Sequence, residues 1–258
     1  MREGNDELRQ SFGSIADRYD RFRPGPPDEA VQRALPPDAL DVLELGAGTG
    51  GLTRRLVRRH PHVRAVEPDG RMRAILLERV PQADGVAGSA EEIPAQDSSF
   101  DAVIGASMWH WVDEARALPE VARVLRPGGT FALLWNGVDR SVDWMRSLWA
   151  GGKELNGEEK VRVDARRRAR HEVHLEPGGP FPEPDRQVIR WTQPMTREDL
   201  VGLAGTYSAV ITMDAPEYRT ARARSRCRCA ASVGVRRGAK SITTPGDGPG
   251  GGGSASIQ

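Results

Sequence analysis

Cysteine is almost absent from this 258-residue chain, since only Cys227 and Cys229 occur and both lie near the C-terminal end. Two neighbouring thiols in a tail do not supply the disulfide framework of a secreted protein, so a cytoplasmic setting is expected. Long apolar runs are lacking as well, and no stretch has the length that spans a membrane. The charged residues 1–9 do not form a secretory signal. We therefore expect a cytoplasmic protein without a membrane partner.

The chain also lacks a large net charge, because the formal value is +1, although this charge is unevenly distributed. Residues 216–258 contain eight Lys or Arg and two Asp or Glu residues, a balance of +6, which leaves −5 for residues 1–215. An acidic main body does not favour a nucleic-acid partner. A basic cluster is interpreted as a solvated helix face or as a rim that attracts an acidic substrate; it consists of Arg166, Arg167, Arg168 and Arg170. We expect no metal site, and the sequence does not specify an oligomeric state.

What the sequence does contain is a strand, a glycine turn and a helix in succession. Residues 41–45 form a short apolar run, residues 46–50 read Gly-Ala-Gly-Thr-Gly, and residues 52–59 have helical spacing. This order opens a nucleotide-binding βαβ unit, in which glycine permits unusual backbone angles and a close approach of the ligand. The turn also satisfies the G-x-G-x-x-G pattern of NAD- and FAD-binding proteins, and a purely structural turn is a third interpretation.

A second strand is expected at residues 63–67, and Glu67 ends it 17 residues after Gly50. Neighbouring parallel strands end at the same edge of a sheet, so this carboxylate can accept hydrogen bonds from both ribose hydroxyls of a nucleoside at the glycine turn. An exposed acid at a strand end is the alternative. Asp69 is expected to cap a helix over residues 70–79.

Further strands are expected at residues 83–87, 100–106, 130–135 and 187–192, with a helix over residues 112–125. In an open parallel sheet, ligands bind outside the carboxyl ends of the strands, which places residues 107–111 beside a cofactor and facing a substrate. This segment reads Ser-Met-Trp-His-Trp. His110 is interpreted as a general base, as part of the pocket lining, or as one member of a packed aromatic corner with Trp109 and Trp111.

Several motifs resemble those of the class I S-adenosylmethionine-dependent methyltransferases. Glu44 lies inside the first strand, two residues before a G-x-G-x-G turn. Residues 88–94 read Gly-Ser-Ala-Glu-Glu-Ile-Pro, residues 99–103 read Ser-Phe-Asp-Ala-Val, and Phe12, Ala16, Tyr19 and residues 22–24 repeat the family's N-terminal pattern. Residues 120–136, together with His110, Trp111 and Asp113, resemble the methyltransferase type 11 subgroup that includes trans-aconitate methyltransferase-like enzymes. The resemblance covers about residues 12–212.

This resemblance implies S-adenosyl-L-methionine as the cofactor and a small molecule as the methyl acceptor. A hydroxyl or amine acceptor would benefit from a general base, for which His110 is the first candidate, whereas a carboxylate or thiol would not need one. An NAD-dependent oxidoreductase and a non-catalytic protein of the same fold are the alternatives. The expected cofactor-binding residues are Glu44, Gly46, Ala47, Gly48, Thr49, Gly50, Glu67, Pro68, Met72, Ser89, Ala90, Glu91 and Ser107; the expected substrate pocket comprises Tyr19, Arg23, Trp109, His110, Trp111 and Asn136.

We expect a helical N-terminal cap at residues 1–36, a cofactor-binding methyltransferase domain at residues 37–215 and a low-complexity basic tail at residues 216–258. The implied fold is α/β, a Rossmann-like doubly wound sheet with parallel strands 1 to 5. After Leu203 the sequence contains no further Leu, Phe or Trp, which predicts disorder from about residue 219 and an incomplete antiparallel C-terminal edge. The tail is interpreted as a frame-shifted translation or as a natural basic segment that binds acidic partners.

Overall fold

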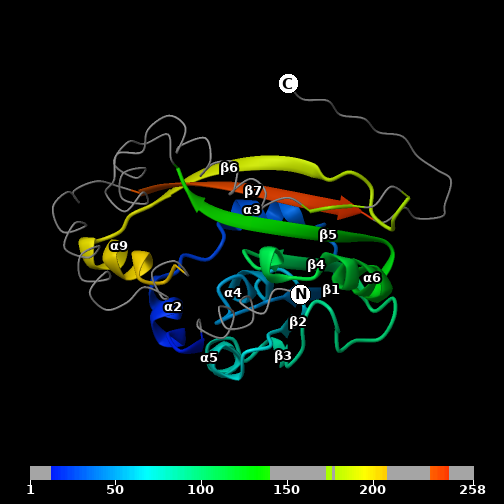
Figure 1. Cartoon of the computed structure of the whole chain (residues 1–258), viewed down its shortest axis with the longest axis horizontal. Coiled ribbons are helices and arrows are strands. Elements are labelled where there is room, and N and C mark those ends of the chain that lie inside the picture. Colours follow the sequence, from blue (N-terminus) through cyan, green and yellow to red (C-terminus); the bar gives the residue numbers. More distant parts are fainter. Residues whose placement is uncertain (1–12, 140–172, 176–177, 208–232, 244–258) are drawn as a thin grey trace.

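The computed structural model describes residues 13–139, 173–175, 178–207 and 233–243 of the chain. Its strands form one seven-stranded sheet in the order β3-β2-β1-β4-β5-β7-β6, with β3 at one edge and β6 at the other (Figure 1). The first five strands run parallel, which confirms the expected Rossmann-like α/β fold. The strand bounds are β1 Asp41–Leu45, β2 His62–Val66, β3 Asp84–Val86, β4 Phe100–Ala106, β5 Leu125–Val138, β6 Asp185–Gln193 and β7 Val233–Thr243.

Helices connect β1 to β2, β2 to β3 and β4 to β5 and cover both faces of the sheet, whereas a loop without a helix connects β3 to β4. α5 begins as expected at Asp69, whose side chain accepts hydrogen bonds from the backbone N–H groups of Arg71 and Met72. α6 is capped in the same way by Asp113, and α9 begins with a capping box between Thr196 and Asp199. The helix bounds are α2 Ala16–Phe22, α3 Asp28–Ala34, α4 Thr53–Leu56, α5 Gly70–Arg79, α6 Glu114–Val124 and α9 Arg197–Ala204, with a 3₁₀ turn, η1, at Trp109–Trp111. Within the described ranges, no helix combines the length and apolar character that a membrane span requires.

Alternate residues of β5 enter two separate cores, one on each face of the sheet. Phe131 and Leu133 pack in the cluster that contains the buried side of α6. Ala132 and Leu134 pack in the cluster that contains α3. A strand covered on both faces is apolar at most positions. This is why residues 42–45, apart from Glu44, and residues 131–135 are recognisable as apolar runs.

The C-terminal edge differs from the prediction, because the tail contributes a strand. β7 lies between β5 and β6 and pairs antiparallel with both. The prediction of an incomplete edge and of disorder throughout the tail is therefore wrong for residues 233–243. Backbone N–H and C=O groups on the facing edges of β5 and β6 can pair with a strand of almost any composition. The small number of apolar residues in the tail therefore did not predict whether it forms a strand. The other predictions for the tail, for Phe12 and for Arg166, Arg167, Arg168 and Arg170 lie outside the described residues.

Candidate active site

The glycine turn after β1 has left-handed backbone angles at Gly46, Gly48 and Gly50. Gly46 has φ +62° and Gly48 has φ +59°, in the left-handed region that side chains disfavour. A Cβ at Gly46 would lie 2.8 Å from Cβ and Cγ of Met108. At Gly48 the nearest atom to such a Cβ is the Met72 sulfur at 3.8 Å, so the main chain there is open to a ligand. The turn and the first turn of α5 thus face each other.

Glu67 follows β2 and holds this turn in place. Its Oε2 accepts the Gly48 N–H at 2.8 Å, and its Oε1 accepts the Asp69 N–H at 2.9 Å. The residue is 7% exposed. A carboxylate offers about four lone-pair positions, which is more than these two backbone bonds occupy. The structure places Glu67 beside the glycine turn. Its role as an acceptor of hydrogen bonds from the ribose hydroxyls stays a prediction.

Glu44 lies inside β1 and is almost fully buried, with 1% of its surface exposed. Burial raises its pKa from the ordinary 4.5 to about 8; the nearby Thr53 hydroxyl partly offsets this rise, and the charge of Glu67 adds to it. Among the described residues, Glu44 Oε2 has no hydrogen-bond partner. The side chain is thus a largely neutral carboxyl group at pH 7, lying directly beneath the turn.

The remaining cofactor candidates lie at the ends of β3 and β4. Ala90 is buried, and Ser89 forms an antiparallel bridge with Glu92. Glu91 accepts the Asp113 N–H at 3.0 Å, which ties this loop to the start of α6. Ser107 follows β4 with φ +56°, a strained value for a residue other than glycine. Its N–H donates to the Leu134 carbonyl at 2.7 Å, which anchors the end of β4 to β5.

The η1 turn separates the three aromatic residues that the sequence grouped together. Trp109 is 2% exposed; its ring packs 5.1 Å from that of Phe131, and its indole N–H donates to Glu114 at 2.7 Å. Trp109 is therefore a core residue, and its predicted place in the pocket lining is not supported by this position. His110 and Trp111 remain half-buried, with ring centroids 4.7 Å apart. Of the three, only these two are placed to meet a substrate.

Arg23 and Tyr19 come from α2 and the segment that follows it. The Arg23 guanidinium donates to the Thr206 hydroxyl and carbonyl, both at 2.9 Å, and stacks on the rings of Tyr19 and Tyr207 at 5.2 and 4.1 Å. No acidic side chain is paired with it in the part of the chain that the structure describes. A half-buried cation without a paired anion is suited to bind a carboxylate.

The N-terminal cap is fastened to the rim of the site at three points. Arg54, just after the glycine turn, donates to Asp20 at 2.6 Å and to the Thr49 carbonyl at 3.3 Å. Gly25 packs so closely on Gly51 that an added Cβ would lie 2.4 Å from its carbonyl oxygen. Asn136, at the end of β5, donates to the Pro24 carbonyl at 2.9 Å. The cap thus lies against both the glycine turn and the end of β5.

Sequence reasoning missed Asp20, Arg54 and Thr206, which build this cap. The partners Asp20 and Arg54 are 34 positions apart, and Arg23 and Thr206 are 183 apart. No short motif links residues at such distances, so no signal in the single sequence could have identified these pairs.

Comparison with known proteins agrees with this arrangement. A methyltransferase domain family matches residues 43–133. A methyltransferase of Mycobacterium tuberculosis with no assigned substrate is 44% identical over 209 residues, covering 81% of this chain and 81% of that protein. A malonyl-[acyl-carrier protein] O-methyltransferase of Methylococcus capsulatus is 33% identical over 171 residues, covering 62% of this chain and 60% of that protein.

The solved structure of a candidate type II methyltransferase from Anaeromyxobacter dehalogenans shares the fold, with a TM-score of 0.59 and 24% identity over 87% of this chain and 98% of that one. The alternative of an NAD-dependent oxidoreductase is wrong, because the matching family and the relatives are methyltransferases. The glycine turn, Glu44 and Glu67 all lie within the residues that the methyltransferase domain family matches. The chain belongs to the class I S-adenosylmethionine-dependent methyltransferases.

Proposed function

We propose that this protein transfers the methyl group of S-adenosylmethionine to a small carboxylic acid bound between the cap and the η1 turn. The observation that carries the proposal is Arg23, a cation held between two tyrosine rings beside the end of β5, with no anion paired to it among the described residues. The cap is formed by the N-terminal residues of the same chain, and hydrogen bonds tie it to Arg54 and Asn136. A cap held in this way restricts the space above the site, which favours a small acceptor over a large one.

The cofactor site of this proposal lies along the carboxyl ends of β1 to β4. The glycine turn and Glu44 are proposed to hold the amino-acid part, Glu67 the ribose, and Ser89 and Ala90 the base. The bound sulfonium supplies a methyl group that is already electrophilic. In this proposal the residues of the cap orient the acceptor oxygen toward that methyl group and exclude water from the site.

A carboxylate acceptor agrees with two further observations. The Methylococcus capsulatus relative is named an O-methyltransferase of malonyl-[acyl-carrier protein]. Residues 120–136 resemble the trans-aconitate methyltransferase-like subgroup. A carboxylate is already ionised at neutral pH, so its oxygen can attack without losing a proton to the protein.

The experiment supplies cofactor labelled in the methyl group together with a panel of small carboxylic acids and their matched amides. We expect label on the acids alone, released as methanol by mild alkali because the product is a methyl ester. Calorimetric titration with S-adenosylhomocysteine and NAD accompanies the assay, and only the former should bind. Label that survives alkali, or that appears equally on the amides, would contradict the carboxylate assignment. A chain that binds S-adenosylhomocysteine but labels no acceptor would support the non-catalytic alternative.

His110 provides a second test of the acceptor class. For a carboxylate acceptor, we expect His110→Gln to change kcat by no more than about twofold, because no proton has to be removed. A hydroxyl or amine acceptor would instead lose on the order of 10²–10⁴-fold in kcat when its general base is removed. Trp111→Phe serves as the control, since it changes the ring beside His110 without changing any titrating group. The pH profiles of kcat for the three proteins measure the difference.

A further inference from the structure

The loop between β3 and β4 is held mainly by α6, with one further hydrogen bond from Arg64 of β2 to the Pro94 carbonyl at 3.2 Å. We call residues 88–98 the base loop, because it contains Ser89 and Ala90. Its own closing bond is long, since the Ser89 N–H meets the Glu92 carbonyl at 3.4 Å. Ala90 and Ile93 are each 3% exposed and pack in the same apolar cluster as α6. Inside the loop, the Ala95 N–H also donates to the Ile93 carbonyl at 2.8 Å. Several further hydrogen bonds to the loop come from α6.

Two side chains of α6 supply hydrogen-bond partners for the backbone of Ile93, which lies outside the strands. Glu120 and Arg123 lie one turn apart and meet in a two-pronged ion pair, with nitrogen–oxygen distances of 2.7 and 2.8 Å. Glu120 Oε2 also accepts the Ile93 N–H at 2.9 Å, and Arg123 donates to the Ile93 carbonyl at 3.0 Å. The backbone N–H and C=O of Ile93 therefore both bond to a single side-chain pair.

Arg123 extends this hold along the base loop. Its second terminal nitrogen donates to the Ala95 carbonyl and to Asp97, both at 2.8 Å. Hydrogen bonds from Arg123 lower the pKa of Glu120, so the pair stays charged at neutral pH. At the other end of α6, Glu91 accepts the Asp113 N–H. The loop is thus held by hydrogen bonds at Glu91, Ile93, Ala95 and Asp97, and Ala90 packs in the same apolar cluster as α6.

We infer that the Glu120–Arg123 pair is a positioning device for the nucleotide base of the cofactor. By fixing the backbone of Ile93 and Ala95, it holds the loop segment of Ser89 and Ala90 against which a flat base would lie. The inference rests on the proposed cofactor site. The two residues act through the loop and do not touch the ligand, so their removal should change affinity for the base without changing the chemical step.

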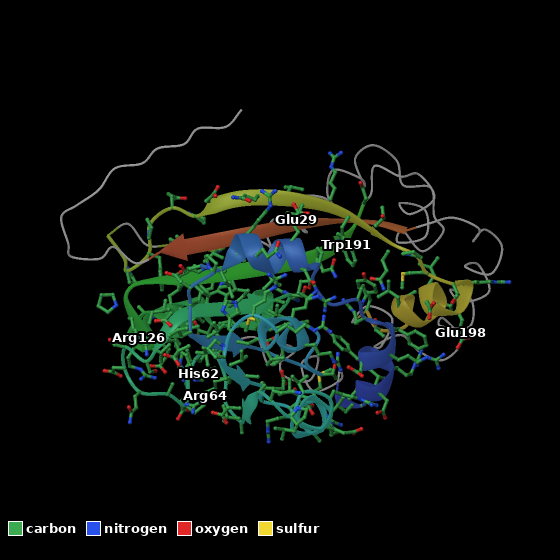
Figure 2. The ribbon with its side chains drawn as sticks, turned by 180° about the vertical axis from the view of Figure 1, so that it is seen from behind. Glu29, His62, Arg64, Arg126, Trp191 and Glu198 are labelled. Carbon is green, nitrogen blue, oxygen red and sulfur yellow. The ribbon has the colours of Figure 1, made fainter. Side chains whose placement is uncertain are left out.

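Arg126 offers a matched control three residues further along the chain. It also pairs with two carboxylates, Asp41 and Asp101, and its side chain is 40% exposed, compared with 31% for Arg123. These partners begin β1 and β4, at the end of the sheet away from the site. Figure 2 shows Arg126 near His62, far from Glu198 on α9. Loss of Arg126 therefore removes comparable ion pairs without releasing the base loop.

The test compares wild type, Arg123→Met, Glu120→Gln and Arg126→Met by calorimetric titration with S-adenosylhomocysteine and with adenosine, alongside Tm. We expect Arg123→Met to weaken both ligands by the same factor, roughly tenfold, and Glu120→Gln to weaken both by about threefold. Arg126→Met should lower Tm to a similar extent and leave both affinities within about twofold of wild type. For Arg123→Met, KM for the cofactor should rise while kcat at saturation stays within about twofold.

Two outcomes separate this inference from the function on which it rests. A wild-type chain that binds neither ligand would overturn the proposed cofactor site and the inference together. A wild type that binds both ligands, with Arg123→Met and Glu120→Gln binding them equally well, would overturn the inference alone. The inference alone would also be overturned if Arg126→Met weakened adenosine binding as much as Arg123→Met does, because the loss of affinity would then follow from lower stability in general.

Discussion

Replacing Glu67 with alanine is expected to weaken S-adenosylhomocysteine binding by about 1–3 kcal/mol, which is the usual loss when buried hydrogen-bonding groups are left without a partner. The expected loss has two sources. The ribose hydroxyls lose their proposed acceptor, and the backbone N–H groups of Gly48 and Asp69 lose the carboxylate that now accepts them at 2.8 and 2.9 Å. Calorimetric titration measures the affinity, and urea unfolding measures the stability cost separately.

A neighbouring carboxylate provides the control for Glu67. Asp69→Asn keeps an oxygen that can cap α5, because asparagine is as good a capping residue as aspartate. Its affinity for S-adenosylhomocysteine should stay close to that of wild type. The affinity of Glu67→Gln for S-adenosylhomocysteine should fall between those of Glu67→Ala and Asp69→Asn. The glutamine amide nitrogen would face one of the two backbone N–H donors and could not accept its hydrogen bond. Unchanged affinity in Glu67→Ala, with the fold intact, would remove Glu67 from the cofactor site.

Replacing Glu44 with glutamine is expected to stabilise the protein increasingly as the pH rises. Burial raises the folded-state pKa of Glu44 to about 8 from an ordinary 4.5, so the folded state binds more protons than the unfolded state between these values. The contribution of wild-type Glu44 is fully present below pH 4.5 and is lost as the pH rises toward 8. The limiting slope is about 1.4 kcal/mol per pH unit. Glutamine keeps the shape and carries no proton to lose.

Urea unfolding of wild type and Glu44→Gln at pH 5, 6, 7 and 8 measures this difference, which should be small at pH 5 and reach several kcal/mol at pH 8. Asp101→Asn is the control of opposite sign. Burial alone would raise the pKa of Asp101, but hydrogen bonds from Asp41, Arg126 and Leu40 outweigh it and lower the value below 3.8. Its stabilising contribution is therefore present at neutral pH and disappears in acid. A pH-independent difference for Glu44→Gln would show that the carboxyl group is not buried as the structure places it.

The cofactor end of the molecule was predictable because its signals are local. A five-residue apolar strand, three glycines at fixed spacing and an acid after the next strand each depend on a short stretch of chain. The parallel pairing of β1 with β2 then brings Glu67 to the turn, since parallel strands end at one edge. The position of Glu44 inside β1 was also visible in the sequence, whereas its burial is a finding of the structure.

The aromatic segment shows where such reasoning fails. The spacing of Trp109, His110 and Trp111 suggests a shared pocket, but a 3₁₀ turn directs consecutive side chains to different sides. Trp109 consequently enters the core against Phe131, and the other two stay near the surface. A sequence of three large rings cannot indicate which of them the neighbouring strand will cover.

The sequence by itself determined the family, the parallel sheet and the residues around the glycine turn, because backbone propensity, strand periodicity and turn chemistry act over a few residues. Only the tertiary structure decided how the cap is fastened through Asp20 and Arg54, that β7 completes the sheet, and that Glu120 and Arg123 support the base loop. Those arrangements depend on side chains and strand edges that meet only after folding, and many sequences could satisfy the same backbone hydrogen bonds.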